Sequence, residues 1–266
     1  MYPVGIVASD DEVVARLQQR LVDGLAPEGS VASVRQAAVA PPEDGDITAQ
    51  LDSDGAWTLY GDDATLSDLL DRLAPATDYA VLTGFPTARV PHVVVGEVDY
   101  DGPVLLAADS PEGVTVEGVL EALADTEPYV TLESLVAEIK RSPNADRSGA
   151  IATFTGRVRE RDSPEDRPTT ELEFEKYEGI AEERMAALEA ELSTRDGVQN
   201  VLMHHRTGVI PSGRDIVFVV VLAGHREEAF RTVEDGINRL KAEVPIFKKE
   251  VTVEEEFWVH ERSGNR

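Results

Sequence analysis

The uneven distribution of charge along the chain is the feature that most limits how it can fold. Residues 1–130 contain 24 acidic and 5 basic residues and no lysine, whereas residues 131–266 contain 27 acidic and 20 basic residues. The net charges of the two halves are −19 and −7, which together make the −26 of the whole chain. A change of this size near Thr126-Glu127-Pro128 is typical of a domain boundary. The sequence therefore predicts two domains, residues 1–126 and 127–266, and the chain is long enough for both.

The excess of carboxylates also limits the partners of the chain. With 51 acidic against 25 basic residues, its surface repels phosphate backbones and anionic lipid, so neither nucleic acid nor membrane is expected as a partner. The absence of cysteine excludes disulfides, thiolate metal sites and a cysteine nucleophile. The longest apolar run, residues 217–223, is too short to cross a bilayer, and no targeting signal is evident. We expect an acidic cytoplasmic protein with no cofactor and no metal site.

Strand and helix patterns alternate in the first half. The apolar run Val4-Gly5-Ile6-Val7 is typical of a buried parallel strand, and Asp10 or Asp11 can cap the helix that follows. A second helical pattern over 66–73 leads to a strand over 79–85 that ends in Gly84-Phe85. Such alternation favours a smaller α/β domain.

The second half is predicted to be an α+β domain with a mainly antiparallel sheet. Strands are expected over 150–158, 171–177, 198–204, 216–223 and 254–259, and helices over 132–141, 181–192 and 227–243. Apolar residues recur in the last helix at steps of three and four, which is typical of a face packed on a sheet. They are Phe230, Val233, Ile237, Leu240 and Val244, and Pro245 follows them as a helix terminator.

Lysine is rare and clustered. Of five lysines in the chain, Lys241, Lys248 and Lys249 fall within nine residues. A basic last helical turn that interacts with the helix dipole explains Lys241, but Lys248 lies beyond Pro245 in an apolar run. A lysine among apolar and cationic neighbours can act as a base or nucleophile. The spacing leaves a surface role and a functional role open.

Two further basic sites lie at the ends of predicted elements. Arg157 and Arg159 lie on the same side of a strand end by the period of two, and His225-Arg226 begin a helix, where free N–H groups attract anions. Ion pairing with surface acids is the alternative for each site. Together the basic sites favour one small anionic ligand, such as a phosphate ester, over a polynucleotide.

Seven segments of the second half occur in an order and spacing that are similar to one family. They are Gly149 to Arg159, Leu172 to Gly179, His205 to Gly208, Gly213 to Phe218, Ala223 to Arg226, Leu240 to Glu250, and Trp258-Val259. This half resembles the catalytic large subunit of molybdopterin synthase. The resemblance implies a sulfur transferase of molybdenum-cofactor biosynthesis, with an α/β hammerhead-like fold, that inserts two sulfurs into cyclic pyranopterin monophosphate.

The resemblance also implies partners and site residues. The sulfur donor is a ubiquitin-like small subunit with a thiocarboxylated Gly-Gly tail, and two large subunits form a homodimer within a heterotetramer. The family's catalytic lysines fall on Lys241 and Lys248. Its substrate-binding residues fall on Arg157, Val158, Arg159, His225, Arg226, Lys249, Glu250 and, contributed to the neighbouring copy, Arg262.

The first half resembles the nucleotide-binding domain of molybdopterin-guanine-dinucleotide adaptor proteins. A phosphate loop needs glycines and a Lys–Ser/Thr pair, but Ala8-Ser9-Asp10-Asp11-Glu12 stands in its place. We therefore predict a degenerate domain that does not bind nucleotide, with a structural or partner-docking role. A GTPase is disfavoured for the same reason. A non-enzymatic scaffold for cofactor assembly is the alternative to the synthase.

Overall fold

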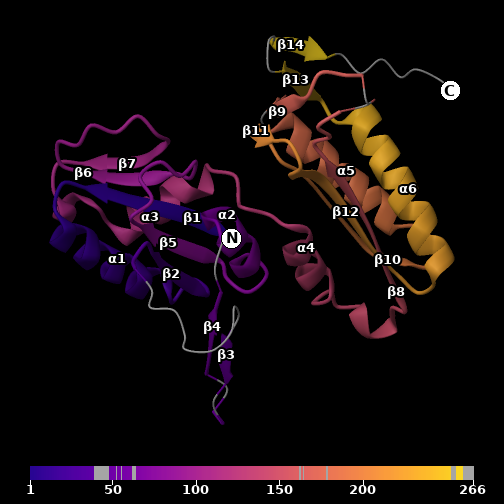
Figure 1. Ribbon diagram of the computed structural model, residues 1–266. Helices are drawn as coiled ribbons and strands as arrows, with labels where there is room; N and C mark the ends of the chain where they lie inside the picture. Colours follow the sequence, from indigo (N-terminus) through magenta and orange to yellow (C-terminus); the bar gives the residue numbers. More distant parts are fainter. Residues whose placement is uncertain are drawn as a thin grey trace. The chain divides into compact units, whose positions relative to one another are not determined.

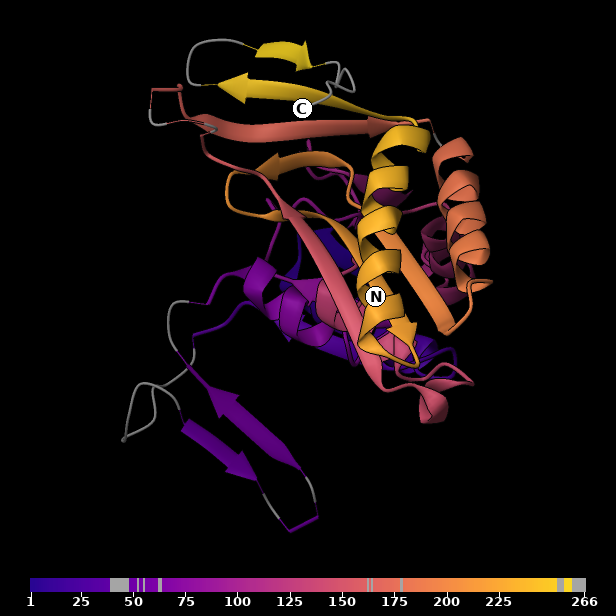
Figure 2. The ribbon, with the colours of Figure 1, turned by 90° about the vertical axis from the view of Figure 1, so that its right-hand side faces the viewer.

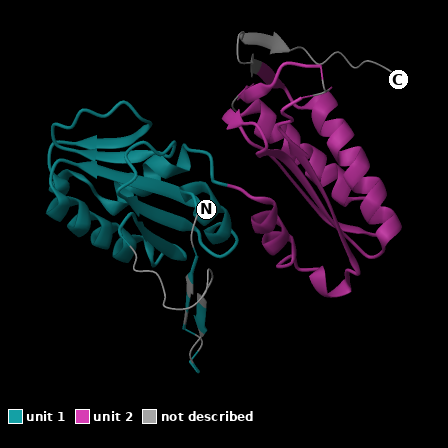
Figure 3. Ribbon diagram, in the orientation of Figure 1, with its two compact units in different colours: residues 1–129 teal, residues 130–266 magenta. Residues whose placement is uncertain are grey.

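The computed structural model describes residues 1–38, 48–51, 53–54, 56–61, 64–161, 163, 165–177, 179–252 and 256–259. The chain divides into two compact units, Met1–Tyr129 and Val130–Arg266 (Figure 3). This division falls three residues after the boundary that the charge distribution predicts. No helix in the described part of the chain is long and apolar enough to cross a membrane.

Unit 1 is a parallel sheet with helices on both faces (Figure 1). The strand order is β2-β5-β1-β6-β7, and every pairing is parallel. The strands of this sheet are β1 (Tyr2–Ala8), β2 (Val31–Arg35), β5 (Tyr79–Thr83), β6 (His92–Val95) and β7 (Val104–Ala108). The helices are α1 (Asp11–Leu25), α2 (Leu66–Leu73), the 3-10 helix η1 (Pro111–Gly113) and α3 (Val116–Ala124).

Alternate residues of the unit 1 strands pack on opposite faces. In β5, Val81 packs with the apolar residues of α1 and α3, whereas Ala80 and Leu82 pack with Leu70 of α2. This three-layer arrangement confirms the α/β prediction for the first half. A separate two-stranded antiparallel hairpin, β3 (Thr48–Leu51) and β4 (Trp57–Tyr60), extends from this unit (Figure 2).

Unit 2 contains two antiparallel sheets, in the orders β10-β12-β8 and β11-β9-β13-β14. Its strands are β8 (Ala150–Arg157), β9 (Thr169–Lys176), β10 (Val198–His205), β11 (Gly208–Pro211), β12 (Asp215–Ala223), β13 (Ile246–Thr252) and β14 (Glu256–Val259). Its helices are α4 (Leu132–Ile139), η2 (Ala145–Arg147), α5 (Ile180–Ser193) and α6 (Arg226–Glu243). The predicted mix of helices and antiparallel strands is confirmed, but the strands form two sheets, and the hammerhead-like detail stays a prediction.

Strand β12 is central and buried on both faces, which explains its continuous apolar run. Val217, Val219 and Val221 pack under α5 and α6, whereas Phe218 and Val220 pack against α4. A strand between two apolar layers needs apolar residues at every position. The two layers of helices and the three-stranded sheet therefore form the core of unit 2.

Helix α6 differs from its prediction at Phe230. Ile237, Leu240 and Val244 are buried as expected, but Phe230 is 63% exposed and Ala229 faces the sheet in its place. Ala229 packs with Ala152 of β8 and Ala223 of β12, and farther along the helix an added Cβ at Gly236 would lie 3.1 Å from both Met203 Cε and Val219 Cγ1. Small residues at this interface leave no room for a phenylalanine ring.

Candidate active site

Lys241 and Lys248 lie on either side of one junction, where α6 ends and β13 begins. Lys241 is exposed in the last turn of α6, and Lys248 is partly buried in the third position of β13. The helix ends at Glu243, before Pro245, and the chain enters β13 directly at Ile246. The two lysines therefore lie on elements that meet at one end of unit 2, where α6 passes into β13 (Figure 2).

The faces of β13 separate Lys248 from Lys249. Lys248 is opposite Phe174 of β9, which is buried in an apolar cluster with Val158 and Ile246, so Lys248 belongs to the inner face. Lys249 is opposite Glu173 and forms an ion pair with it at 3.5 Å, so its side chain lies on the outer face. Lys249 is predicted to bind substrate, but its side chain lies on the opposite face of β13 from that of Lys248. Glu250 is in β13, but its side chain lies outside the described residues.

The end of β8 lies against the same apolar cluster. Arg157 is exposed and donates from Nε to Gly213 O at 3.2 Å, and it also pairs with Asp215 at 3.5 Å. Val158 is buried, its N–H donates to Arg214 O and its carbonyl accepts from Gly213 N–H. Arg159 is exposed just beyond the strand. Arg157 and Arg159 both face solvent, and Arg157 also holds the turn before β12.

His225 and Arg226 lie at the other end of α6. His225 is the N-cap residue, its side chain makes no capping hydrogen bond, and both residues are exposed. Fifteen residues separate Arg226 from Lys241, which corresponds to about 22 Å along a helix that rises 1.5 Å per residue. One chain thus does not bring its predicted basic residues into one site. Arg262 lies outside the described residues.

The first turn of α1 holds carboxylates where a phosphate loop would bind an anion. Strands β1 and β5 are neighbours in the sheet, so their carboxyl ends meet at Ala8 and Thr83. The side chain of Asp10 caps α1 and accepts from Glu12 N–H at 2.8 Å, and Asp11 lies in the same turn. The Asp10 side chain occupies the N–H of Glu12, and the carboxylates of Asp10 and Asp11 repel phosphate from the place where the backbone N–H groups of a phosphate loop would bind it.

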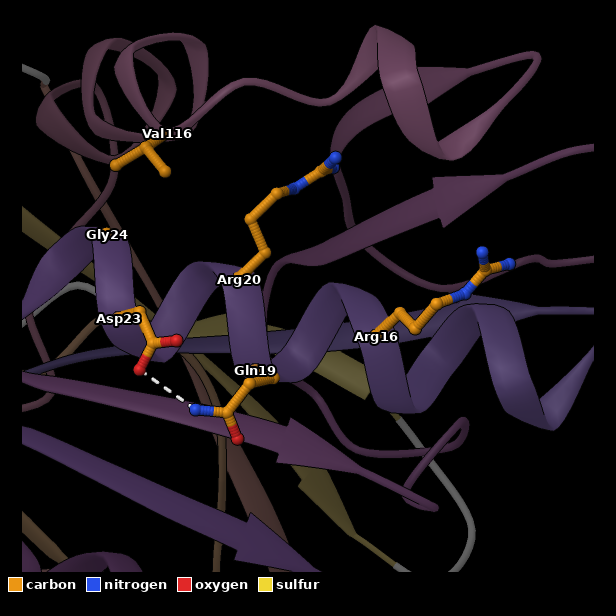
Figure 4. Close-up of a pocket in the computed structure, with 6 residues that line it drawn as sticks. All are labelled: Arg16, Gln19, Arg20, Asp23, Gly24 and Val116. Atoms are coloured by element: carbon orange, nitrogen blue, oxygen red, sulfur yellow. Dashed lines mark hydrogen bonds between the residues drawn. The ribbon is translucent and has the colours of Figure 1, made fainter.

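A shallow hollow on unit 1 lies between α1 and α3 (Figure 4). Its lining residues are Arg16, Gln19, Arg20, Asp23, Gly24 and Val116. Arg20 donates to Val114 O at 2.9 Å, and Gln19 Nε2 donates to Asp23 Oδ1 at 2.9 Å. These contacts join the helices. The hollow contains none of the predicted site residues, and no group of three or more His, Asp or Glu among the described residues could hold a metal ion.

Sequence reasoning did not identify Lys176 as a residue of this end of unit 2. It is the last residue of β9, and its side chain is only 9% exposed and forms an ion pair with Glu182 of α5. The scarcity of lysine in the chain was a signal that could have identified it.

Comparisons with known proteins agree with the resemblance. The family model described as MoaE protein matches residues 126–243. The chain is 50% identical over 269 residues to a probable molybdopterin synthase from Haloferax volcanii, a match that covers 98% of this chain and 100% of that protein. It is 37% identical over 120 residues to the molybdopterin synthase catalytic subunit of Yersinia pestis, covering 45% of this chain and 78% of that protein.

This chain is also similar to a solved structure of a MobB protein homolog from Bacillus stearothermophilus. The identity is 17% and the TM-score is 0.38, and the match covers 47% of this chain and 100% of that chain. The Haloferax volcanii protein matches along its whole length, and residues 126–243 match the family model. The chain therefore belongs to the molybdopterin synthase catalytic subunit (MoaE) family, which serves molybdenum-cofactor biosynthesis.

Proposed function

We propose that the chain inserts two sulfur atoms into cyclic pyranopterin monophosphate and so forms the dithiolene of molybdopterin. The observation that carries the proposal is the junction of α6 and β13, which presents Lys241 and Lys248 at the end of unit 2 where Arg159 also lies. Cations at one place suit an anionic substrate, and lysine is rare in this chain of net charge −26.

The sulfur comes from the thiocarboxylated Gly-Gly tail of a ubiquitin-like small subunit. The chain contains no cysteine that could carry a persulfide, so a separate donor is required. Lys241 and Lys248 stabilise the negative charge that develops as the thiocarboxylate gives up its sulfur, and one of them acts as general acid or base. Arg159 binds the anionic substrate beside them.

His225 and Arg226 join this site from a second copy of the chain. The separation of about 22 Å between Arg226 and Lys241, set by the 1.5 Å rise of a helix, is too large for both to contact one small substrate. In this arrangement a twofold dimer brings the start of one α6 to the end of the other, and the reciprocity of a twofold interface makes its two sites equivalent. With one small subunit at each site, the assembly is a heterotetramer.

The test is conversion of cyclic pyranopterin monophosphate to molybdopterin by the purified chain and a thiocarboxylated Gly-Gly-tailed subunit, in concentrated salt. Lys241→Ala should reduce turnover about 100-fold or more, the range for loss of a general acid or base, without unfolding the protein. Lys140→Ala is the matched control, because Lys140 is an exposed lysine at the end of α4. Near-normal turnover by Lys241→Ala contradicts the assignment, and a folded wild type that binds its partner but makes no product favours a scaffold.

A further inference from the structure

Lys176 is a nearly buried lysine that forms an ion pair with a carboxylate of another element. Its side chain is 9% exposed, and its Nζ forms an ion pair with Glu182, which is 45% exposed. The pair joins the last residue of β9 to the first turn of α5. A buried ammonium group is costly unless an anion accompanies it, so this site requires a negative charge next to Lys176.

The register of β9 and β13 places Lys176 on the same face as Lys248. Lys248 is opposite Phe174 and Ile246 is opposite Lys176, so the two lysines are diagonal neighbours. The outer face carries the Glu173–Lys249 ion pair and the edge-to-face contact of Tyr177 with Phe247. Diagonal Cβ atoms in an antiparallel pair are about 7–8 Å apart, which is within the reach of two lysine side chains that share one anion.

The start of α5 lies beside the end of α6. Arg184 forms an ion pair with Glu243, and Arg239 forms one with Glu191 at 2.8 Å, so the two helices run antiparallel. Glu182 lies two residues before Arg184, near the end of α6 that carries Lys241. Four of the five lysines of the chain therefore lie at this end of unit 2, with Lys249 on the outer face of β13.

We propose that Lys176 is a further binding residue of the site, and that its ammonium group holds the anionic end of the Gly-Gly tail of the sulfur donor. Glu182 is paired with Lys176 when the tail is absent and moves into solvent when the tail arrives. This exchange keeps the buried ammonium paired throughout, and the exposed half of Glu182 gives it a path to water. The proposal rests on the proposed function, because that function supplies the tail.

Two synthetic peptides that end in Gly-Gly test the proposal in binding titrations with the full chain. One peptide ends in a thiocarboxylate and the other in a neutral carboxamide. The wild type should bind the charged peptide about tenfold more tightly, the usual size of one charge-assisted hydrogen bond in affinity. Lys176→Met should lose this preference and Lys176→Arg should keep most of it. Glu182→Gln is the matched control: it breaks the same ion pair but leaves the cation, so it should keep or increase the preference.

A purely structural role predicts a different pattern. If Lys176 only fastens β9 to α5, Lys176→Met and Glu182→Gln should lower the melting temperature and the peptide preference together. That result overturns the proposal, and so does a wild type that does not distinguish the two peptides. Turnover is not needed for this readout. A wild type that prefers the charged peptide but makes no molybdopterin refutes the proposed function and leaves the role of Lys176 supported.

Discussion

The two units place opposite charges at the ends of their strands. In unit 1, β1 leads into Asp10, Asp11 and Glu12, and the carboxylate of Asp10 takes the N–H that an anion would otherwise use. In unit 2, β8 leads into Arg159 and β12 leads into His225, whose side chain makes no capping hydrogen bond. The net charge of each half therefore does not describe the charge at the ends of its strands. The few residues that follow each strand set that local charge.

The largest expected effect concerns the two basic ends of α6 in unit 2, which the proposed site joins across two copies of the chain. Lys241→Ala and Arg226→Ala should each abolish turnover as pure dimers, because each removes one part of every site. Mixed after subunit exchange, they should recover about a quarter of wild-type turnover, because half of the dimers are mixed and each has one intact site. Product formation measured before and after exchange checks this. No recovery, with exchange demonstrated, means that both residues are needed within one chain.

The next effect is on the free energy of unfolding at acid pH. It is expected in unit 2, where His204 lies. Burial, with the cations of Arg206 and His205 nearby, lowers the pKa of His204 from 6.5 to about 3. Below pH 6.5 the unfolded chain takes up a proton that the folded chain does not, so the free energy of unfolding falls as the pH falls from 6.5 towards 3. The slope reaches about 1.4 kcal/mol per pH unit for one proton.

Urea unfolding of the wild type and of His204→Phe between pH 7 and pH 4 measures this contribution. The phenylalanine keeps the ring that stacks on Phe218, with centroids 6.5 Å apart in the wild type, but it cannot titrate. The variant should therefore lose part of the acid dependence. Equal slopes for wild type and His204→Phe would show that His204 is protonated in the folded protein.

Glu189 should give a smaller effect of the opposite sign. Burial raises the pKa of Glu189 from 4.5 to about 7, even though Met203 N–H donates to its Oε1 at 2.5 Å, and the charge of Glu138 raises it further. The folded state holds this proton between pH 4.5 and 7, so the stability that Glu189 contributes is lost as the pH rises through that range. Glu189→Gln should raise the free energy of unfolding at pH 8 by up to about 3 kcal/mol.

The measurement is urea unfolding at pH 5 and pH 8. The gain of Glu189→Gln over wild type should be present at pH 8 and absent at pH 5. Glu183→Gln is the control, because Glu183 is an exposed residue of the same helix. A gain that is independent of pH would assign the effect to packing and not to ionisation.

The smallest expected effect concerns the carboxylates at the start of α1 in unit 1. Asp10→Ala removes the N-cap of α1 and should lower the free energy of unfolding of unit 1 by about 1 kcal/mol. Labelled GTP should bind neither the wild type nor this variant at micromolar concentration, because Asp11 and Glu12 remain in the first turn. Micromolar binding to the wild type would show that the carboxylates do not exclude phosphate.

The elements with clear apolar periods could be predicted from the sequence, and the arrangement of the strands could not. The helix over 66–73 matches α2 residue for residue, because its apolar positions and its Thr65 cap are local. Strand β13 was missed, because Lys248 and Lys249 interrupt the apolar run that would have indicated a strand. Adjacent lysines suggested one basic group, yet the period of two sends them to opposite faces.

The candidate site shows the same division. The lysine cluster identifies the end of α6 and β13, because it is a property of one short segment. His225 and Arg226 lie at the opposite end of α6 from Lys241 because of the length of this helix. The separate sequence motifs do not give that length. Val158 lies in the core and Lys176 lies beside Lys248 because of the pairing of β9 with β13, which is a contact between distant segments.

The close approach of α6 at Gly236 has a mechanical consequence. At Gly236 an added Cβ would lie 3.1 Å from Met203 Cε and Val219 Cγ1, and Lys241 lies five residues beyond it. A methyl group at this position would push on Met203 and Val219, and a rigid helix would pass that displacement on to its last turn. Gly236 thus acts as a pivot for the last turn of α6, and a change at this position can move Lys241 without touching it.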